Sequence, residues 1–244
     1  MIIITGIHKS GINIVSNLLS ICTESLENTS PLYNKNNQIQ NDNRNQIAMS
    51  INKTILKFAG GNWCNPPSEQ QIASVGKRLG HFIKKFSEIF KDGIVKDSLL
   101  NLTISLWEKY CNNITSIIFC LRNPIDVALS LQHQNGLSIE TGLQLWYVYT
   151  IRFIKGTVKI PVVVVDFDNI ISNVGYEMDH LLTELGVSML PQDLNYCNKE
   201  LEKNHLNKYR QSTKLIEKLP EEIKKLYTLI RSQTFMYRES PLVV

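Results

Sequence analysis

Four short apolar runs, rich in β-branched residues, divide this chain, and stretches of helical periodicity separate them. The runs are Ile2–Thr5, 93–96, Ser116–Leu121 and 162–167. Continuous apolar runs of this length are typical of strands that are buried on both faces of a sheet. Strands alternating with helices predict an α/β fold of three layers, with a mainly parallel central sheet flanked by helices. In such sheets, ligands bind at the carboxyl ends of the strands.

Helical patterns and one polar segment account for most of the remaining chain. A helix is predicted from Ile12, and further helices over 46–58, 68–90, 99–110, 124–134, 138–154, 174–185 and 213–232. The segment 24–45 is rich in Asn, Gln and Ser, which predicts a long surface loop of the kind that gates a substrate site. No internal repeat or linker interrupts the pattern, so we expect a single domain over residues 1–244.

Composition narrows the class of partner and the compartment. The formal net charge is only +4, and no run of Lys and Arg is long enough to follow a nucleic-acid duplex, so we expect the excess positive charge to serve a small anion. The five cysteines form no C-x-x-C pair, and the histidines show no ligand spacing, so neither a disulfide framework nor a metal site is predicted. No apolar run reaches spanning length, and the start of the chain does not resemble a secretory leader. We therefore expect a cytoplasmic protein without a membrane partner.

The first motif lies between the first strand and the first helix, over residues 6–13. A helix amino terminus offers free N–H groups to an anion, and Lys9 adds a full positive charge beside them. A Walker A loop would have Gly-Lys followed by Ser or Thr, whereas here the lysine precedes Gly11, and that glycine is followed by Ile12 and Asn13, which offer no hydroxyl to hold magnesium. This order argues against a nucleotide kinase and leaves a metal-free phosphate loop or a plain strand-to-helix turn. The residues expected to hold the anion are Lys9, Ser10, Gly11, Ile12 and Asn13.

The second motif follows the third predicted strand, over residues 121–131. Arg122 leaves the strand, and Ser130 follows two turns into the next helix. A guanidinium fork and a hydroxyl together suit a terminal phosphomonoester. Asn123 and Asp126 are interpreted as caps or braces of the helix start.

Together the two motifs resemble the sulfotransferases that use 3′-phosphoadenosine 5′-phosphosulfate (PAPS), and in particular the bacterial branch of that family. The resemblance runs from Met1 to about Asp168. It implies that 9–13 hold the 5′-phosphosulfate and that the Arg-Asn-Pro-x-Asp-x-x-x-Ser pattern from Arg122 to Ser130 holds the 3′-phosphate. It further implies a P-loop-like fold, PAPS as co-substrate without a metal, and transfer of a sulfuryl group to a hydroxyl or amine of a small molecule. A late step on a natural product of alkaloid type is the expected context.

Two segments depart from the family pattern. Lys96 and Asp97 match its Lys-Asp pair, but Ser98 and Leu99 replace the Pro-Arg that follows. Gln40 stands where the family has a carboxylate that can act as a base. We therefore assign Lys9 and Lys96 to charge stabilisation, and leave the base open between His8 and Asp97, either of which can equally be a brace.

Two further functions remain open alternatives. The chain could be a non-catalytic nucleotide-binding protein derived from a sulfotransferase, or it could sulfate a glycan. Trp63, beside Pro66 and Pro67, is the aromatic residue expected to contact the acceptor. The sequence specifies neither the acceptor, nor the atom that is sulfated, nor the oligomeric state.

Overall fold

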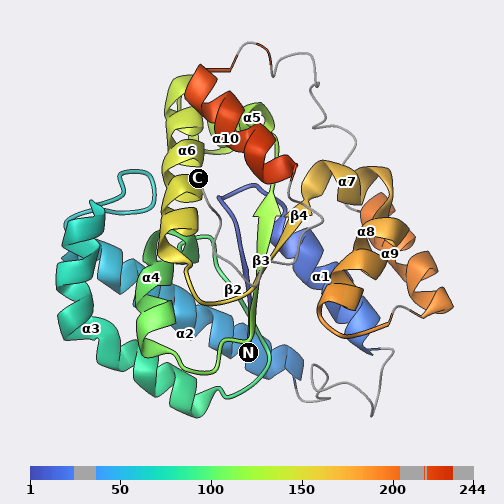
Figure 1. Cartoon of the computed structure of the whole chain (residues 1–244), viewed down its shortest axis with the longest axis horizontal. Coiled ribbons are helices and arrows are strands. Elements are labelled where there is room, and N and C mark those ends of the chain that lie inside the picture. The colour runs from blue at the N-terminus through green and yellow to red at the C-terminus, as the bar shows by residue number, and fades with distance from the viewer. Residues whose placement is uncertain (25–36, 189, 204–216, 218, 233–244) are drawn as a thin grey trace.

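A four-stranded parallel sheet forms the centre of the protein (Figure 1). The computed structural model describes residues 1–24, 37–188, 190–203, 217 and 219–232. The strands are β1 (Ile2–Thr5), β2 (Ile94–Lys96), β3 (Ser116–Leu121) and β4 (Val162–Asp166). They pair in the order β2-β1-β3-β4, and each pair is parallel. The predicted α/β fold is therefore confirmed, and all four carboxyl ends lie at one edge of the sheet.

Helices cover both faces of the sheet, which explains why the strands are apolar without alternation. Ile3, Ile117 and Phe119 face one hydrophobic core, while Ile4 and Ile118 face the other. The first core is closed by α2 (Asn37–Phe58), α3 (Glu69–Ile89), α4 (Leu100–Tyr110), α5 (Pro124–Asn135), α6 (Ile139–Gly156) and α10 (Glu221–Arg231). The second core is closed by α1 (Ile12–Glu24), α7 (Phe167–Ser172), α8 (Val174–Glu184) and α9 (Pro191–Lys203).

The prediction of a polar loop over residues 24–45 is wrong for residues 37–45, because α2 begins at Asn37. Arg44 explains why this polar stretch is helical: its side chain is 5% exposed, and its guanidinium lies 5.4 Å from the centre of the Phe90 ring. Arg44 continues a buried stripe of α2 through Ala48 and Asn52, so tertiary packing overrides the weak helix propensity of Asn. Residues 25–36 of the expected loop lie outside the described residues.

Two element boundaries and one additional helix also differ from the sequence prediction. The fourth strand ends at Asp166, whose side chain accepts a hydrogen bond from Asp168 N at 2.8 Å and so starts α7 at Phe167. Helix α9 is not predicted by the sequence pattern, because its residues are mostly polar. Helix α10 begins at Glu221, and residues 213–216 of the longer predicted helix lie outside the described residues.

No helix in the described ranges combines the length and the apolar character needed to cross a bilayer.

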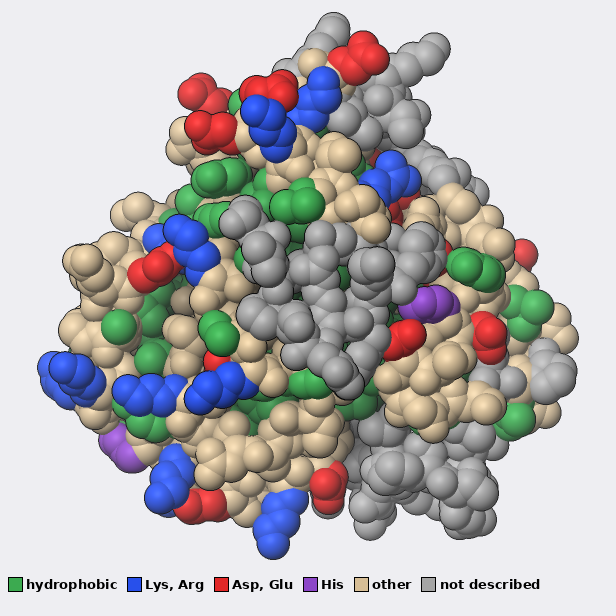
Figure 2. All heavy atoms as spheres, in the orientation of Figure 1, with side chains coloured by type: hydrophobic (Ala, Val, Ile, Leu, Met, Phe, Trp, Pro, Cys, Tyr) green, Lys and Arg blue, Asp and Glu red, His purple; other side chains and the backbone are tan. Residues whose placement is uncertain are grey.

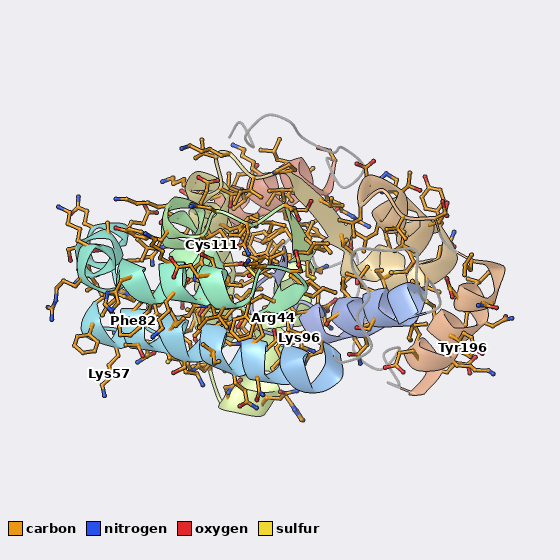
Figure 3. The ribbon with its side chains drawn as sticks, turned by 90° about the horizontal axis from the view of Figure 1, so that it is seen from below. Arg44, Lys57, Phe82, Lys96, Cys111 and Tyr196 are labelled. Atoms are coloured by element: carbon orange, nitrogen blue, oxygen red, sulfur yellow. The ribbon has the colours of Figure 1, made fainter. Side chains whose placement is uncertain are left out.

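Figure 3 shows α2 running along the lower side of the molecule beside α3, with Lys96 near the N-terminal half of α2.

Candidate active site

A cleft of about 930 Å³ opens at the carboxyl ends of β1, β2 and β3. One side, here called the strand-end wall, consists of His8, Lys9, Gly11, Ile12, Asn13 and Arg122. The other side, here called the α2 wall, consists of Asn45, Met49, Lys53 and Lys57. Trp63, Lys96, Asp97 and Ser98 are among the residues that complete the lining. The cleft therefore occupies the place where the parallel sheet predicts a ligand site.

The β1–α1 loop turns sharply to bring its backbone to the cleft. Ser10 N donates to Ile7 O at 3.0 Å, and Lys9 adopts a left-handed φ of 72°. Gly11 follows with a φ of 93°, and a Cβ on it would overlap the ring of Phe167. The first backbone hydrogen bond of α1 runs from Val15 N to Gly11 O at 3.0 Å, so the preceding N–H groups have no acceptor within the helix. An anion can take those hydrogen bonds.

Arg122 joins the two predicted anion loops. Its Nη1 donates to the carbonyl oxygen of Lys9 at 2.7 Å, and its guanidinium lies 4.9 Å from the centre of the Phe167 ring. Its Nε is buried and has no partner among the described residues. The Lys9 ammonium donates to Oε1 of Gln134, on α5. The contact with the Lys9 carbonyl joins the loop that follows β1 to the end of β3.

The helix start after β3 is built as the sequence predicts. Oδ1 of Asn123 accepts from Ile125 N at 2.9 Å, and Pro124 occupies the first turn of α5. Ser130 Oγ donates to the carbonyl oxygen of Asp126 at 2.7 Å. Ser130 and Ser10 are both buried and do not line the cleft. Among the residues expected to bind the donor, the structure thus brings together Lys9, Gly11, Ile12, Asn13 and Arg122.

His8 lies where the cleft meets the core. Its ring stands edge-on to Trp63 with 4.9 Å between the ring centres, and the centre of the Tyr149 ring is 6.0 Å away. The Ser98 hydroxyl lies 2.9 Å from Nδ1 and 3.1 Å from Nε2 of His8. Burial, with the charges of Lys9 and Lys53, lowers the pKa of His8 to about 4. The imidazole is therefore neutral at pH 7 and has one nitrogen with a lone pair, but the lowered pKa makes it a weaker base than an ordinary histidine.

Asp97, the other candidate base, is held by structural hydrogen bonds. Its Oδ2 accepts from Asn52 Nδ2 at 2.8 Å, and its Oδ1 accepts from Leu99 N at 3.1 Å. Burial raises the pKa of this carboxyl, and the hydrogen bonds from Asn52 and Leu99 oppose that rise. Oδ1 of Asn52 in turn accepts from Thr103 Oγ1 and Trp107 Nε1, each at 2.8 Å. This network ties α2 to α4 and to the end of β2, so the geometry favours Asp97 as a brace.

Lys96 and Gln40 complete the set of expected catalytic positions. Lys96 lines the cleft, and its backbone N–H donates to Asn45 Oδ1 at 2.8 Å. Gln40 falls within α2, but its side chain lies outside the described part of the structure, as do residues 34–36. Its assignment to the position of the missing carboxylate stays a prediction.

Sequence reasoning missed the α2 wall. Its four residues follow one another at intervals of four, so they form one stripe along the helix. That spacing is visible in the sequence, but Asn45 falls within the expected loop, and a stripe of mixed polarity resembles any solvated helix face.

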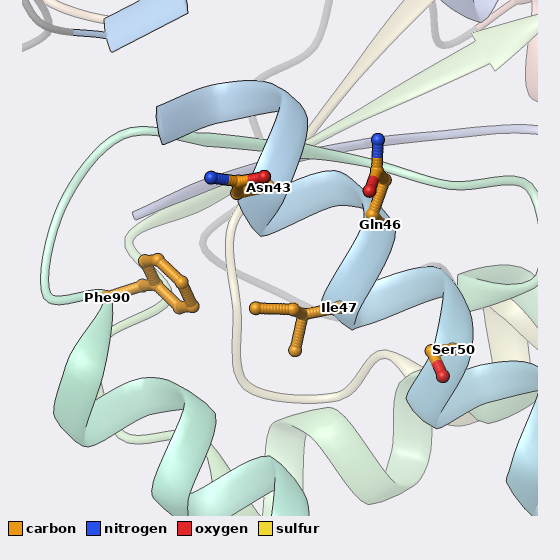
Figure 4. Close-up of a pocket in the computed structure, with 5 residues that line it drawn as sticks. All are labelled: Asn43, Gln46, Ile47, Ser50 and Phe90. Atoms are coloured by element: carbon orange, nitrogen blue, oxygen red, sulfur yellow. The ribbon is translucent and has the colours of Figure 1, made fainter. Parts of the chain in front are cut away.

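A second pocket, of about 380 Å³, lies on another side of α2 (Figure 4). Asn43, Gln46, Ile47, Ser50 and Phe90 line it, and none of these side chains is charged. The larger cleft therefore holds the groups suited to chemistry. Within the described ranges, no cluster of His, Cys, Asp and Glu is arranged to hold a metal ion.

The fold and this cleft define an α/β protein with a cleft that is lined by cationic side chains at the ends of parallel strands. Among solved structures, the chain is similar to the sulfotransferase domain from the olefin synthase of Synechococcus PCC 7002. That likeness has a TM-score of 0.56 at 11% sequence identity, and covers 95% of this chain and 94% of the other. The sulfotransferase domain from the curacin biosynthetic pathway matches at a TM-score of 0.45 and 14% identity, covering 80% of this chain and 76% of that one. No family model and no curated sequence matches the chain.

Proposed function

We propose that this protein is a PAPS-dependent sulfotransferase that acts on a hydroxyl or amine of a small molecule. The observation that carries the proposal is the hydrogen bond from Arg122 to the Lys9 carbonyl, because it joins two anion-binding loops at the ends of adjacent strands. A donor with phosphates at both ends of one nucleoside needs two such loops in one cleft. The fold of the Synechococcus olefin synthase domain supports the same activity, and its source supports a natural product as the acceptor.

The residues present fit a bisphosphorylated nucleotide without a metal. Arg122 keeps a buried Nε without a partner among the described residues, so it has a donor left for a phosphate oxygen. The N–H groups at the start of α1 and the charge of Lys9 suit the second phosphate. After Gly11 the loop has Ile12 and Asn13, where a Walker A motif has the lysine and the Ser or Thr that holds magnesium.

PAPS carries an activated sulfuryl group on its 5′-phosphate, and transfer of this group leaves a bisphosphate. Lys9 would stabilise the negative charge that grows on the leaving phosphate. Neutral His8 would take the proton that the acceptor loses, and Ser98 would hold its ring by accepting from the other nitrogen. Asp97 would keep the end of β2 and Lys96 in place.

Calorimetric titration with 3′-phosphoadenosine 5′-phosphate tests the donor site directly. We expect binding that weakens at least 100-fold in Arg122→Ala and is unchanged in Arg78→Ala, which removes an exposed arginine of α3. Failure of the bisphosphate to bind, or tighter binding of ATP with magnesium, would refute the proposal. Binding without turnover over a broad panel of acceptors would instead identify a non-catalytic nucleotide-binding protein.

A further inference from the structure

The α2 wall carries charge that the donor does not require. Helix α2 buries Arg44, Ala48 and Asn52 in the core and turns the neighbouring stripe toward the cleft. Lys53 and Lys57 are one helical turn apart on that stripe. Both side chains are exposed to the cleft, and neither has a carboxylate within 4.0 Å among the described residues. They are free to bind an anion.

Other lysines of this protein are also exposed, but Lys53 and Lys57 differ from them because they lie in a concave site. Figure 2 shows Lys and Arg side chains over α3 and α4, on the outside of the molecule. Lys53 and Lys57 instead line a concave site, in which the described lining includes five cationic side chains and one carboxylate. The cations are Lys9, Lys53, Lys57, Lys96 and Arg122, and the carboxylate is Asp97.

The charge of Lys53 acts electrostatically on both candidate bases, His8 and Asp97. Together with Lys9, it helps to lower the pKa of His8, and it opposes the rise in the pKa of Asp97. Lys53 is therefore near the proposed base, while Lys57 is one turn further along α2. An acceptor whose reacting group meets His8 would pass Lys53 and extend toward Lys57.

Apolar side chains also line this part of the cleft, and the loop that carries one of them is held in place. Trp63 lines the cleft, as do Met49 and Leu56. The loop that carries Trp63 is fixed at two points: Tyr149 Oη donates to Trp63 O at 2.8 Å, and Gly61 N donates to Leu56 O at 3.0 Å. A fixed indole ring beside apolar side chains suits a flat apolar group.

We infer that the acceptor is an amphipathic anion: a small molecule with a hydroxyl or amine at one end, an apolar body, and a carboxylate at the other. This inference rests on the proposed function for the identity of the reacting group. The reacting group meets His8, the apolar body packs on Trp63, and the carboxylate binds Lys53 and Lys57.

Matched pairs of hydroxyaryl acids and their methyl esters test the charge preference. The probes are 4-hydroxyphenylacetate, 3-(4-hydroxyphenyl)propanoate and 4-(4-hydroxyphenyl)butanoate, each titrated calorimetrically beside its ester. We expect at least one acid to bind about tenfold more tightly than its ester, since charge-assisted hydrogen bonds are the strong ones. Titrations with and without saturating bisphosphate separate this site from the donor loops, because the bisphosphate would displace an acid that had bound there.

Substitutions assign the preference to the α2 wall. The double variant Lys53→Met, Lys57→Met should bind acid and ester equally well, whereas Lys84→Met, an exposed lysine of α3, should keep the preference. The inference is overturned if no acid is preferred, if none of the probes binds, or if the double variant keeps the preference. The proposed function fails separately, by loss of bisphosphate binding, because the acid–ester comparison does not depend on the donor.

Discussion

The two walls of the cleft differ in whether backbone conformation or side chains alone determine their shape and charge. The strand-end wall is shaped by its backbone: it contains the start of α1, the left-handed turn at Lys9 and Gly11, and Arg122, which is bonded to a main-chain carbonyl. The α2 wall presents only side chains on a regular helix, and none of its described residues has an unusual backbone. A site for a constant nucleotide can be built into the backbone, whereas a site for a variable acceptor can change by substitution alone.

The largest effect is expected where His8 of the strand-end wall meets the acceptor. His8→Gln removes the proposed base, so turnover should fall by roughly 10²–10⁴-fold. Binding of the bisphosphate should stay within about twofold, since the substitution leaves Lys9, Arg122 and the backbone N–H groups at the start of α1 in place. Steady-state kinetics with PAPS and an accepted substrate measure the turnover, and calorimetry measures the affinity for the bisphosphate. A decrease in turnover of less than tenfold would exclude His8 as the base.

Asn52→Ala should detach the α2 wall from the rest of the site. It leaves Trp107 Nε1 and Asp97 Oδ2 without their partner, and removes one of the two acceptors of Thr103 Oγ1, so the free energy of unfolding should drop by about 3 kcal/mol. Urea denaturation measures this change. Asn43→Ala, on an exposed position of the same helix, should cost less than about 0.5 kcal/mol. Equal losses in the two variants would show that the network contributes nothing specific.

Gly11→Ala should damage the strand-end wall alone. A Cβ there meets the Phe167 ring in a backbone conformation that disfavours side chains, so the loop must move, and affinity for the bisphosphate should fall by about 100-fold. Gly186→Ala is the matched control, since Gly186 has a φ of 73° with no atom within 4 Å of a Cβ. It shares the backbone strain without the clash and should leave affinity unchanged. Unchanged affinity in Gly11→Ala would separate this loop from the donor.

The smallest effect is expected from electrostatic coupling across the cleft. Lys53→Met removes one cause of the lowered pKa of His8, so that pKa should rise from about 4 toward the ordinary value. Because His8 binds its proton more weakly in the folded protein, the protein loses stability as pH falls from about 6.5 toward 4. The variant should lose a few tenths of a kcal/mol less over that range, since Lys53 is exposed and screened. Titration of the His8 ring by NMR measures the change in its pKa, and urea denaturation at pH 7 and pH 5 measures the change in stability. If the pKa of His8 does not change, Lys53 is too far away to act on it.

The sequence predicted the strand-end wall better than the α2 wall, for a physical reason. Apolar runs and glycine-containing loops record backbone requirements, so the amino-acid sequence alone places Ile2–Thr5 in a strand and residues 9–13 at its end. Met49 and Lys57 meet no backbone requirement, and only the packing of α2 decides which of its stripes faces the cleft. The choice between His8 and Asp97 depends on long-range partners such as Asn52, and no local pattern encodes those contacts.

Lys9 is the one non-glycine residue with positive φ among the described residues, at 72°. Glycine would adopt this conformation with about 1 kcal/mol less strain, so Lys9→Gly would give a more relaxed turn that lacks the cation. A selection for stability alone would therefore tend to remove this side chain, while a selection for activity would restore it. The loop thus marks a position where thermal stability and the proposed sulfuryl transfer oppose each other, and attempts to stabilise this protein should leave it unchanged.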